Sequence, residues 1–228
     1  MSKTKGWIIS AAVVMLTVAA VVLCFVFAPS RVAITVAVLA AVVCISLPFF
    51  MAFEKGRLTP RRIVLLAVMT SLSVVSRIVF APLPHFKPVT AMTMISGVYL
   101  GPVCGFVSGV LTALISNFYF GQGLYTPYQM VAWGLIGLIS ALLSKPLKKS
   151  LPLALIFAAL SGVFYSLVMD LWTVIGMDEG FNLSRYGAAI ISSLPITAIY
   201  CVSNVLFTLL LFKPIGKKLD RVITKFGE

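Results

Sequence analysis

Long apolar runs separated by short polar segments dominate the pattern along this chain. A helix needs about 20 apolar residues to cross a bilayer, and shorter runs suffice where protein shields their ends. Because backbone groups in lipid must be satisfied within the protein, and since no alternating strand pattern occurs, each run predicts a helix. Eight runs qualify: Trp7–Phe27, Val32–Phe53, Ile63–Ala81, Val89–Leu100, Val103–Phe120, Pro127–Leu143, Leu151–Val174 and Tyr186–Phe212.

The composition places these helices in a membrane. Hydrophobic residues make up 61% of the 228 positions and charged residues 11%, which leaves too little polar surface to coat a water-soluble globule. The first run follows Lys3 and Lys5 but is longer than a signal-peptide core and lacks a small-x-small cleavage site. We therefore expect an all-α, polytopic transmembrane bundle in which the first run is a genuine span.

The net charge of +12 comes from cations that cluster in alternate loops, which is the positive-inside pattern. This distribution predicts that both termini lie in the cytoplasm. Four of the 18 cations fall elsewhere: Arg31, Lys87 and Arg185 on the opposite side, and Arg77 within a span. The predicted cytoplasmic cations are Lys3, Lys5, Lys55, Arg57, Arg61, Arg62, Lys145, Lys148, Lys149, Lys213, Lys217, Lys218, Arg221 and Lys225.

A polar stretch, Glu54–Arg62, divides the chain into two units. Residues 1–56 predict a two-helix transmembrane hairpin, and residues 57–228 a six-helix membrane domain with a basic cytoplasmic tail. Within the second unit, small residues recur every four positions from Gly97 to Ala113, with Pro102 as a break. Such spacing lets helices approach closely, either inside the chain or against a partner.

Catalytic signatures are missing from the sequence. It contains no phosphate-binding G-x-x-x-x-G-K-[ST], no H-E-x-x-H and no G-x-S-x-G, and its one histidine is His85. The four cysteines lack metal-ligand spacing. We expect no catalytic residues, no metal site and no ATPase site in this chain.

Polar and aromatic residues gather at the predicted outer face. Tyr125, Gln129 and Trp133 share one helix face after a glycine-containing loop, which suits either an interfacial aromatic belt or a ligand platform. Arg77 and Asp170 lie within spans at similar depth, so they could pair with each other or contact a ligand. A proline-stiffened loop presents His85 and Lys87 nearby.

Residues 57–213 resemble the S components, the substrate-binding membrane subunits, of energy-coupling factor (ECF) transporters. The resemblance rests on a basic start into the first core helix, a proline-rich outer loop and the run Ile95–Gly105 over two short helices. The run Gly121–Gly134 is similar to the subgroup assigned to cobalamin or related corrinoids. Two alanines four residues apart form the family's docking motif, and the matching positions here are Ala67 and Ser71, the serine being a departure.

The resemblance implies a six-helix fold that captures a vitamin at its outer face in a prokaryotic plasma membrane. The S component would then dock on a transmembrane coupling subunit with two ATPase subunits, topple and release its cargo inside. It implies no permanently bound cofactor, cobalamin as the transported ligand, and ATP used by the partners. The predicted ligand-binding residues are Arg77, His85, Lys87, Asn117, Gln122, Tyr125, Tyr128, Gln129, Trp133, Tyr165, Asp170 and Trp172.

Two alternatives remain open at this point. A smaller vitamin or a heteroaromatic precursor would use a similar site, because residue counts do not measure the volume of a pocket. The chain could instead be a membrane scaffold, in which case the small-residue faces would be partner interfaces.

Overall fold

The computed structural model describes residues 30–54, 59–178 and 180–225, together with residues 19 and 23. Regular structure in these ranges is helical, apart from an isolated bridge between Ser30 and Gly180. The predicted first span, Trp7–Phe27, lies outside the described residues. The helices are α2 (Arg31–Glu54), α3 (Pro60–Val79), α4 (Val89–Leu100), α5 (Pro102–Phe120), α6 (Thr126–Leu142), α7 (Ser144–Lys149), α8 (Leu151–Asp178) and α9 (Leu183–Lys225).

Within the described ranges, four helices are long and apolar enough to cross a membrane: α3, α5, α8 and α9. The helices α4 and α6 are apolar but have 12 and 17 residues, so they rise about 18 and 26 Å, less than the ~30 Å of a bilayer core. Almost all of α4 is buried, so protein rather than lipid surrounds it. The eight-span layout and the cytoplasmic termini stay predictions.

The break between α4 and α5 falls where the sequence predicts it. Gly101 has a φ of 94°, a left-handed conformation that favours glycine, and its N–H closes α4 on the Gly97 carbonyl at 3.0 Å. Pro102 then begins α5, where its missing N–H leaves no hydrogen bond unmade. The chain thereby turns between the short α4 and the longer α5, which remain packed on each other.

Small residues let α4, α5 and α6 touch backbone to backbone. A Cβ on Gly105 would overlap the carbonyl of Gly137 in α6, and one on Gly109 would overlap the backbone of Trp133 and Gly134. Gly97 in α4 faces the same Gly137 carbonyl. Of the two interpretations of the small-residue stripe, the structure therefore supports packing inside the chain.

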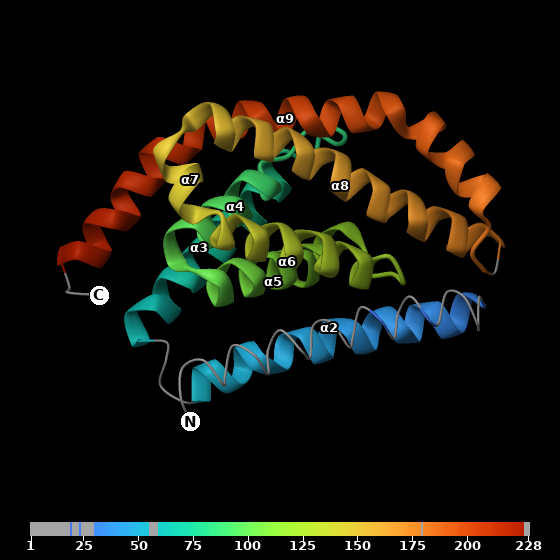
Figure 1. Ribbon diagram of the computed structural model, residues 1–228, viewed down its shortest axis with the longest axis horizontal. Helices are drawn as coiled ribbons and strands as arrows, with labels where there is room; N and C mark the ends of the chain where they lie inside the picture. Colours follow the sequence, from blue (N-terminus) through green and yellow to red (C-terminus); the bar gives the residue numbers. More distant parts are fainter. Residues whose placement is uncertain (1–18, 20–22, 24–29, 55–58, 179, 226–228) are drawn as a thin grey trace.

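The helices α8 and α9 lie side by side and arch over the α4–α6 group, whereas α2 lies on the opposite side of it (Figure 1). Ile34 and Val38 of α2 are buried against Tyr128 of α6 and Ile175 of α8. The second helix of the predicted hairpin therefore packs on the bundle.

The largest differences from the predicted elements lie at the end of α9 and at α7. The last helix continues through Pro214 to Lys225, whereas the apolar run ends at Phe212. The charged residues after Phe212 remain helical because one side of this last segment of α9 is still apolar. Phe212 and Leu219 stay buried on that side. The short helix α7 was not predicted, since its six residues, three of them lysines, carry no apolar run.

Candidate ligand-binding site

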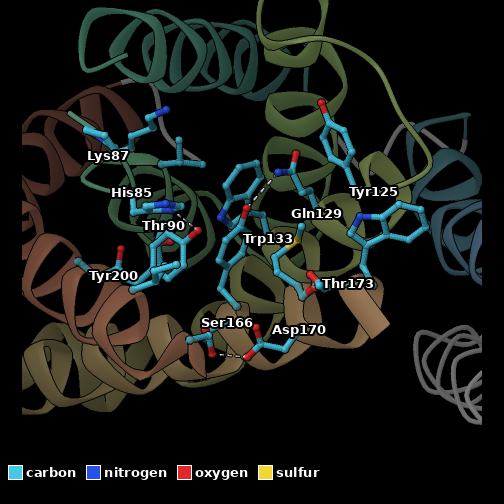
Figure 2. Close-up of a pocket in the computed structure, with 18 of the residues that line it drawn as sticks. His85, Lys87, Thr90, Tyr125, Gln129, Trp133, Ser166, Asp170, Thr173 and Tyr200 are labelled. Atoms are coloured by element: carbon cyan, nitrogen blue, oxygen red, sulfur yellow. Dashed lines mark hydrogen bonds between the residues drawn. The ribbon is translucent and has the colours of Figure 1, made fainter. Parts of the chain in front are cut away.

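One cavity of about 610 Å³ lies between α3, α4, α6, α8 and α9, beneath the loop that joins α3 to α4. Figure 2 shows side chains from these elements converging on it. Nine of the twelve predicted ligand-binding residues line this cavity: Arg77, His85, Lys87, Tyr125, Gln129, Trp133, Tyr165, Asp170 and Trp172. Residues far apart in the sequence therefore share one site.

A continuous row of rings forms one wall. Trp133 of α6 and Tyr165 of α8 stack with ring centroids 5.0 Å apart and planes only 13° from parallel. Tyr200 of α9 meets Tyr165 edge to face at 5.1 Å, and His85 meets Tyr200 in the same way at 5.4 Å. These contacts join three helices and the loop into one aromatic wall that lines the cavity.

Arg77 enters the site from α3 and is 7% exposed. Its Nη1 donates to the Ser116 hydroxyl and, at 2.8 Å, to Asn117 Oδ1. Its guanidinium carbon lies 4.6 Å from the ring centroid of Phe120 and 4.9 Å from that of Trp133. The cation is thus held between neutral hydrogen-bond acceptors and aromatic faces.

The proposed Arg77–Asp170 pair is not formed. Asp170 accepts a hydrogen bond from the Ser193 hydroxyl at 2.7 Å, whereas Arg77 binds Ser116 and Asn117. Both side chains line the cavity, but they reach it from α3 and α8 and use different partners. Similar depth in two helices therefore did not place them together.

Asn117 lies behind the wall rather than in it. Its amide nitrogen donates to Gln129 Oε1 and to the Thr126 hydroxyl, both at 2.9 Å. Gln129 Nε2 in turn donates to the Tyr165 hydroxyl at 3.1 Å. Asn117 therefore holds Arg77 and Gln129 in place, and Gln129 orients Tyr165.

Gln122 and Tyr128 also lie outside the cavity lining. Gln122 Nε2 donates to the Leu114 carbonyl at 2.8 Å, so its amide stabilises the loop before α6. Tyr128 is buried on another face of α6, where its ring meets Trp172 at 5.4 Å and packs near α2. One residue along a helix turns the side chain by about 100°, which separates Tyr128 from its neighbour Gln129.

The α3–α4 loop adds two titratable groups. The Lys87 ammonium lies 4.2 Å from the centroid of Phe120, and burial followed by the charge of Arg77 lowers the pKa of Lys87. His85 has a φ of 60°, and its Nδ1 is hydrogen-bonded to the Tyr200 hydroxyl at 2.9 Å. Burial, and secondly the charge of Lys87, lowers the pKa of His85.

Several lining residues escaped the sequence analysis, among them Thr90, Ser166, Thr173, Ser193, Tyr200 and Asn204. The last three follow one face of α9 at helical spacing, a polar stripe in an otherwise apolar helix. That stripe was a usable signal. Asn204 lines the cavity and also donates to the Ala158 carbonyl of α8 at 3.3 Å.

The two residues of the predicted docking motif lie on a different face of α3. Ala67 and Ser71 are exposed, beside the exposed apolar side chains of Val64, Val68 and Leu72. The opposite face of α3 carries Arg77 into the cavity. One helix thus presents a small-residue outer surface and a site residue on its inner side.

A comparison with protein families identifies the family of the chain. Residues 57–217 match the model of the ECF-type riboflavin transporter, S component, family. The chain belongs to this family. No curated protein and no solved structure matches the chain.

Membership of the family confirms the resemblance to ECF S components, and with it a transport subunit rather than an enzyme. Together with the four long apolar helices, it identifies an integral membrane protein. The cobalamin-specific subgroup is not supported, since the family description names riboflavin. The sequence run Gly121–Gly134, on which that subgroup rested, forms a loop and the start of α6. Gln122 and Thr126 of this run make hydrogen bonds within the protein.

Proposed function

We propose that this chain is the S component that captures riboflavin, or a closely related flat heteroaromatic compound, for an ECF transporter. The proposal rests on the stacked Trp133–Tyr165 pair, which lines the cavity of a chain that belongs to the riboflavin transporter S-component family. A planar tricyclic ring can lie on such an aromatic wall and gain both apolar burial and ring–ring contact.

The size of the cavity favours this class of ligand over a corrinoid. A volume of about 610 Å³ falls within the range of sites that enclose drug-sized molecules. Cobalamin has several times the bulk of a three-ring vitamin, and most of it would remain outside. We therefore replace the corrinoid prediction with the smaller heteroaromatic alternative.

Polar groups around the wall suit the carbonyls, ring nitrogens and hydroxyls of such a ligand. Gln129 and Thr90 offer an amide and a hydroxyl, and Asp170 with Ser193 offers a carboxylate and a hydroxyl. Buried polar groups of this kind reject ligands that leave them unpaired, so they would provide specificity more than affinity.

The proposed direction of transport follows the charges. From the positive-inside pattern we infer that the Lys145–Lys149 segment and the end of α9 lie in the cytoplasm, and that the cavity therefore lies at the outer face. Ligand would enter from the medium. In keeping with the family, we propose that a transmembrane coupling subunit docks on α3 at Ala67 and Ser71, and that two ATPase subunits supply the energy for release.

A binding experiment tests the proposal. Protein purified in detergent is titrated with riboflavin while flavin fluorescence is followed, because stacking on aromatic rings quenches it. We expect saturable binding that Trp133→Ala weakens at least about ten-fold, given the contact area of an aromatic anchor. Phe118→Ala is the control, since Phe118 is 77% exposed on the same bundle. No saturable binding of riboflavin, or binding of labelled cobalamin instead, would refute the proposed substrate.

A further inference from the structure

Two cations occupy one end of the cavity without a carboxylate beside them. Arg77 and Lys87 both lie against Phe120, with 4.6 and 4.2 Å from the charged groups to the ring centroid. In the part of the chain that the structure describes, neither forms an ion pair. Asp170, the single acidic residue of the cavity lining, hydrogen-bonds Ser193 instead.

This arrangement costs free energy in the empty protein. A buried charge is tolerated when it is paired, and the acceptors of Arg77, Ser116 and Asn117, are neutral. Guanidinium carries five donors, so two acceptors on Nη1 leave others available to a ligand. The aromatic face of Phe120 attracts both cations but cannot cancel two charges.

The mutual effect of the cations points the same way. Burial first, and then the charge of Arg77, lowers the pKa of Lys87, so the two cations repel each other across the short distance set by Phe120. An anion placed between them would remove that repulsion and would stabilise the charged form of Lys87. A ligand with an anionic group would supply this counter-charge.

We propose that the physiological ligand of this cavity carries one anionic group, a phosphate monoester or a carboxylate, on its flat ring system, and that this group binds between Arg77 and Lys87. The inference rests on the proposed function for the ring and extends it to a charged form of the ligand. Phosphate and carboxylate both match the guanidinium fork of Arg77.

The geometry also sets the orientation of the ligand. Figure 2 shows Lys87 and His85 on one side of the cavity, and Asp170 and Thr173 on another, with Trp133 between them. An anionic substituent at the Asp170 end would meet a like charge, which is unfavourable. The ring then lies over Trp133 with its anionic arm towards the α3–α4 loop.

Riboflavin and riboflavin 5′-phosphate, titrated in parallel, distinguish the two proposals. We expect the phosphate ester to bind at least about ten-fold more tightly at low salt, because charge-assisted hydrogen bonds are the strong ones. The difference should shrink as ionic strength rises. Equal affinities, or tighter binding of uncharged riboflavin, would overturn the inference and leave the proposed function intact.

A pair of variants assigns the effect to the cation cluster. Lys87→Gln should remove most of the preference for the phosphate ester, measured as the ratio of the two flavin affinities in the same variant. Lys148→Gln is the matched control, because the Lys148 ammonium also lies 4.2 Å from an aromatic centroid, that of Tyr99, away from the cavity. A preference that survives in Lys87→Gln would contradict the assignment.

A second readout does not depend on flavins. Inorganic phosphate should raise the thermal midpoint of the wild-type protein relative to chloride at equal ionic strength, and should do so less in Lys87→Gln. If neither flavin binds but this difference appears, the proposed substrate fails and the anion site stands. If riboflavin binds and phosphate shifts both proteins equally, the anion site fails alone.

Discussion

Asn117 joins Arg77 to Gln129: its Oδ1 accepts a hydrogen bond from the guanidinium at 2.8 Å, and its amide nitrogen lies 2.9 Å from Gln129 Oε1. The side chain is fully buried and does not line the cavity. One amide thus positions a cation of α3 and a polar group of α6 at the same time.

Replacing Asn117 by Asp should change the selectivity of the site. The new carboxylate would lie beside Arg77 and supply the counter-charge that we assign to the ligand. Titration with both flavins should then show a smaller preference for the phosphate ester than in the wild type.

Asn117→Ala, which supplies no charge, is the control. It should lower the free energy of unfolding by about 1–3 kcal/mol, because the buried Arg77 donor and the buried Gln129 acceptor lose their partner. An unchanged preference in Asn117→Asp would contradict this account of Arg77.

Gly109→Ala should destabilise the contact between α5 and α6. The added methyl would overlap the backbone of Trp133 and Gly134, which a rotamer change cannot relieve. We expect a loss of about 1–3 kcal/mol, typical of overpacking, seen as a lower thermal midpoint in detergent. Gly187→Ala is the matched control, since a Cβ there meets nothing within 4 Å, and it should cause no loss. Equal midpoints for the two variants would argue against tight packing at Gly109.

The stability of the protein should fall as pH falls below about 6.5, the ordinary pKa of histidine. His85 is the single histidine of the chain, and its pKa is lowered in the folded state, chiefly by burial. Between the two pKa values the unfolded chain binds the proton and the folded chain does not, so protons favour unfolding.

Thermal midpoints measured at pH 7.5, 6.5 and 5.5 would test this pH dependence. The decline should be small, because the His85 ring is only partly desolvated and keeps contact with solvent, and His85→Gln should flatten it. A decline of equal size in His85→Gln would assign the effect to other groups.

Ser71→Trp should impair assembly without impairing ligand binding. Ser71 lies on the exposed side of α3, whereas the cavity lies against the opposite side of this helix. A bulky side chain at Ser71 would therefore hold a partner helix away from α3. Co-purification of coupling and ATPase subunits should drop several-fold, with flavin affinity unchanged. Leu160→Trp, at a 61% exposed position of α8, should leave co-purification intact. Full assembly of Ser71→Trp would exclude this part of α3 as the docking surface.

Much of the fold was accessible from the sequence because helix ends carried explicit signals. Gly101 and Pro102 mark the turn between α4 and α5, and apolar runs define the cores of the described helices other than α7. The end of α9 was missed, since Phe212 is the last residue of a continuous apolar run although burial continues to Leu219. Apolar runs report lipid contact, whereas a one-sided stripe suffices at a helix end.

The residues of the candidate site could be predicted from the sequence where their side chains are rare in membrane-spanning helices. Arg77, Asp170 and Trp133 stand out by type and depth, and all three line the cavity. Their partners could not be deduced, because helix rotation decides which neighbours meet: Arg77 finds Asn117 rather than Asp170. Hydroxyl residues such as Ser166 and Ser193 were missed, since serine is also common where membrane helices simply pack.

The length of α9 has a mechanical consequence. Its 43 residues would extend about 65 Å if straight, twice the ~30 Å of a bilayer core, and Figure 1 shows it as a long arched helix. The turns that follow Pro214 therefore extend beyond the length of α9 that a bilayer core can hold. A small tilt of the part in the bilayer would displace the basic C-terminal end of α9 by a larger distance. Spin labels at Lys225 and at a fixed point of α6 would read that displacement as a change in separation. The position of the C-terminal end of α9 would therefore report the orientation of the whole bundle.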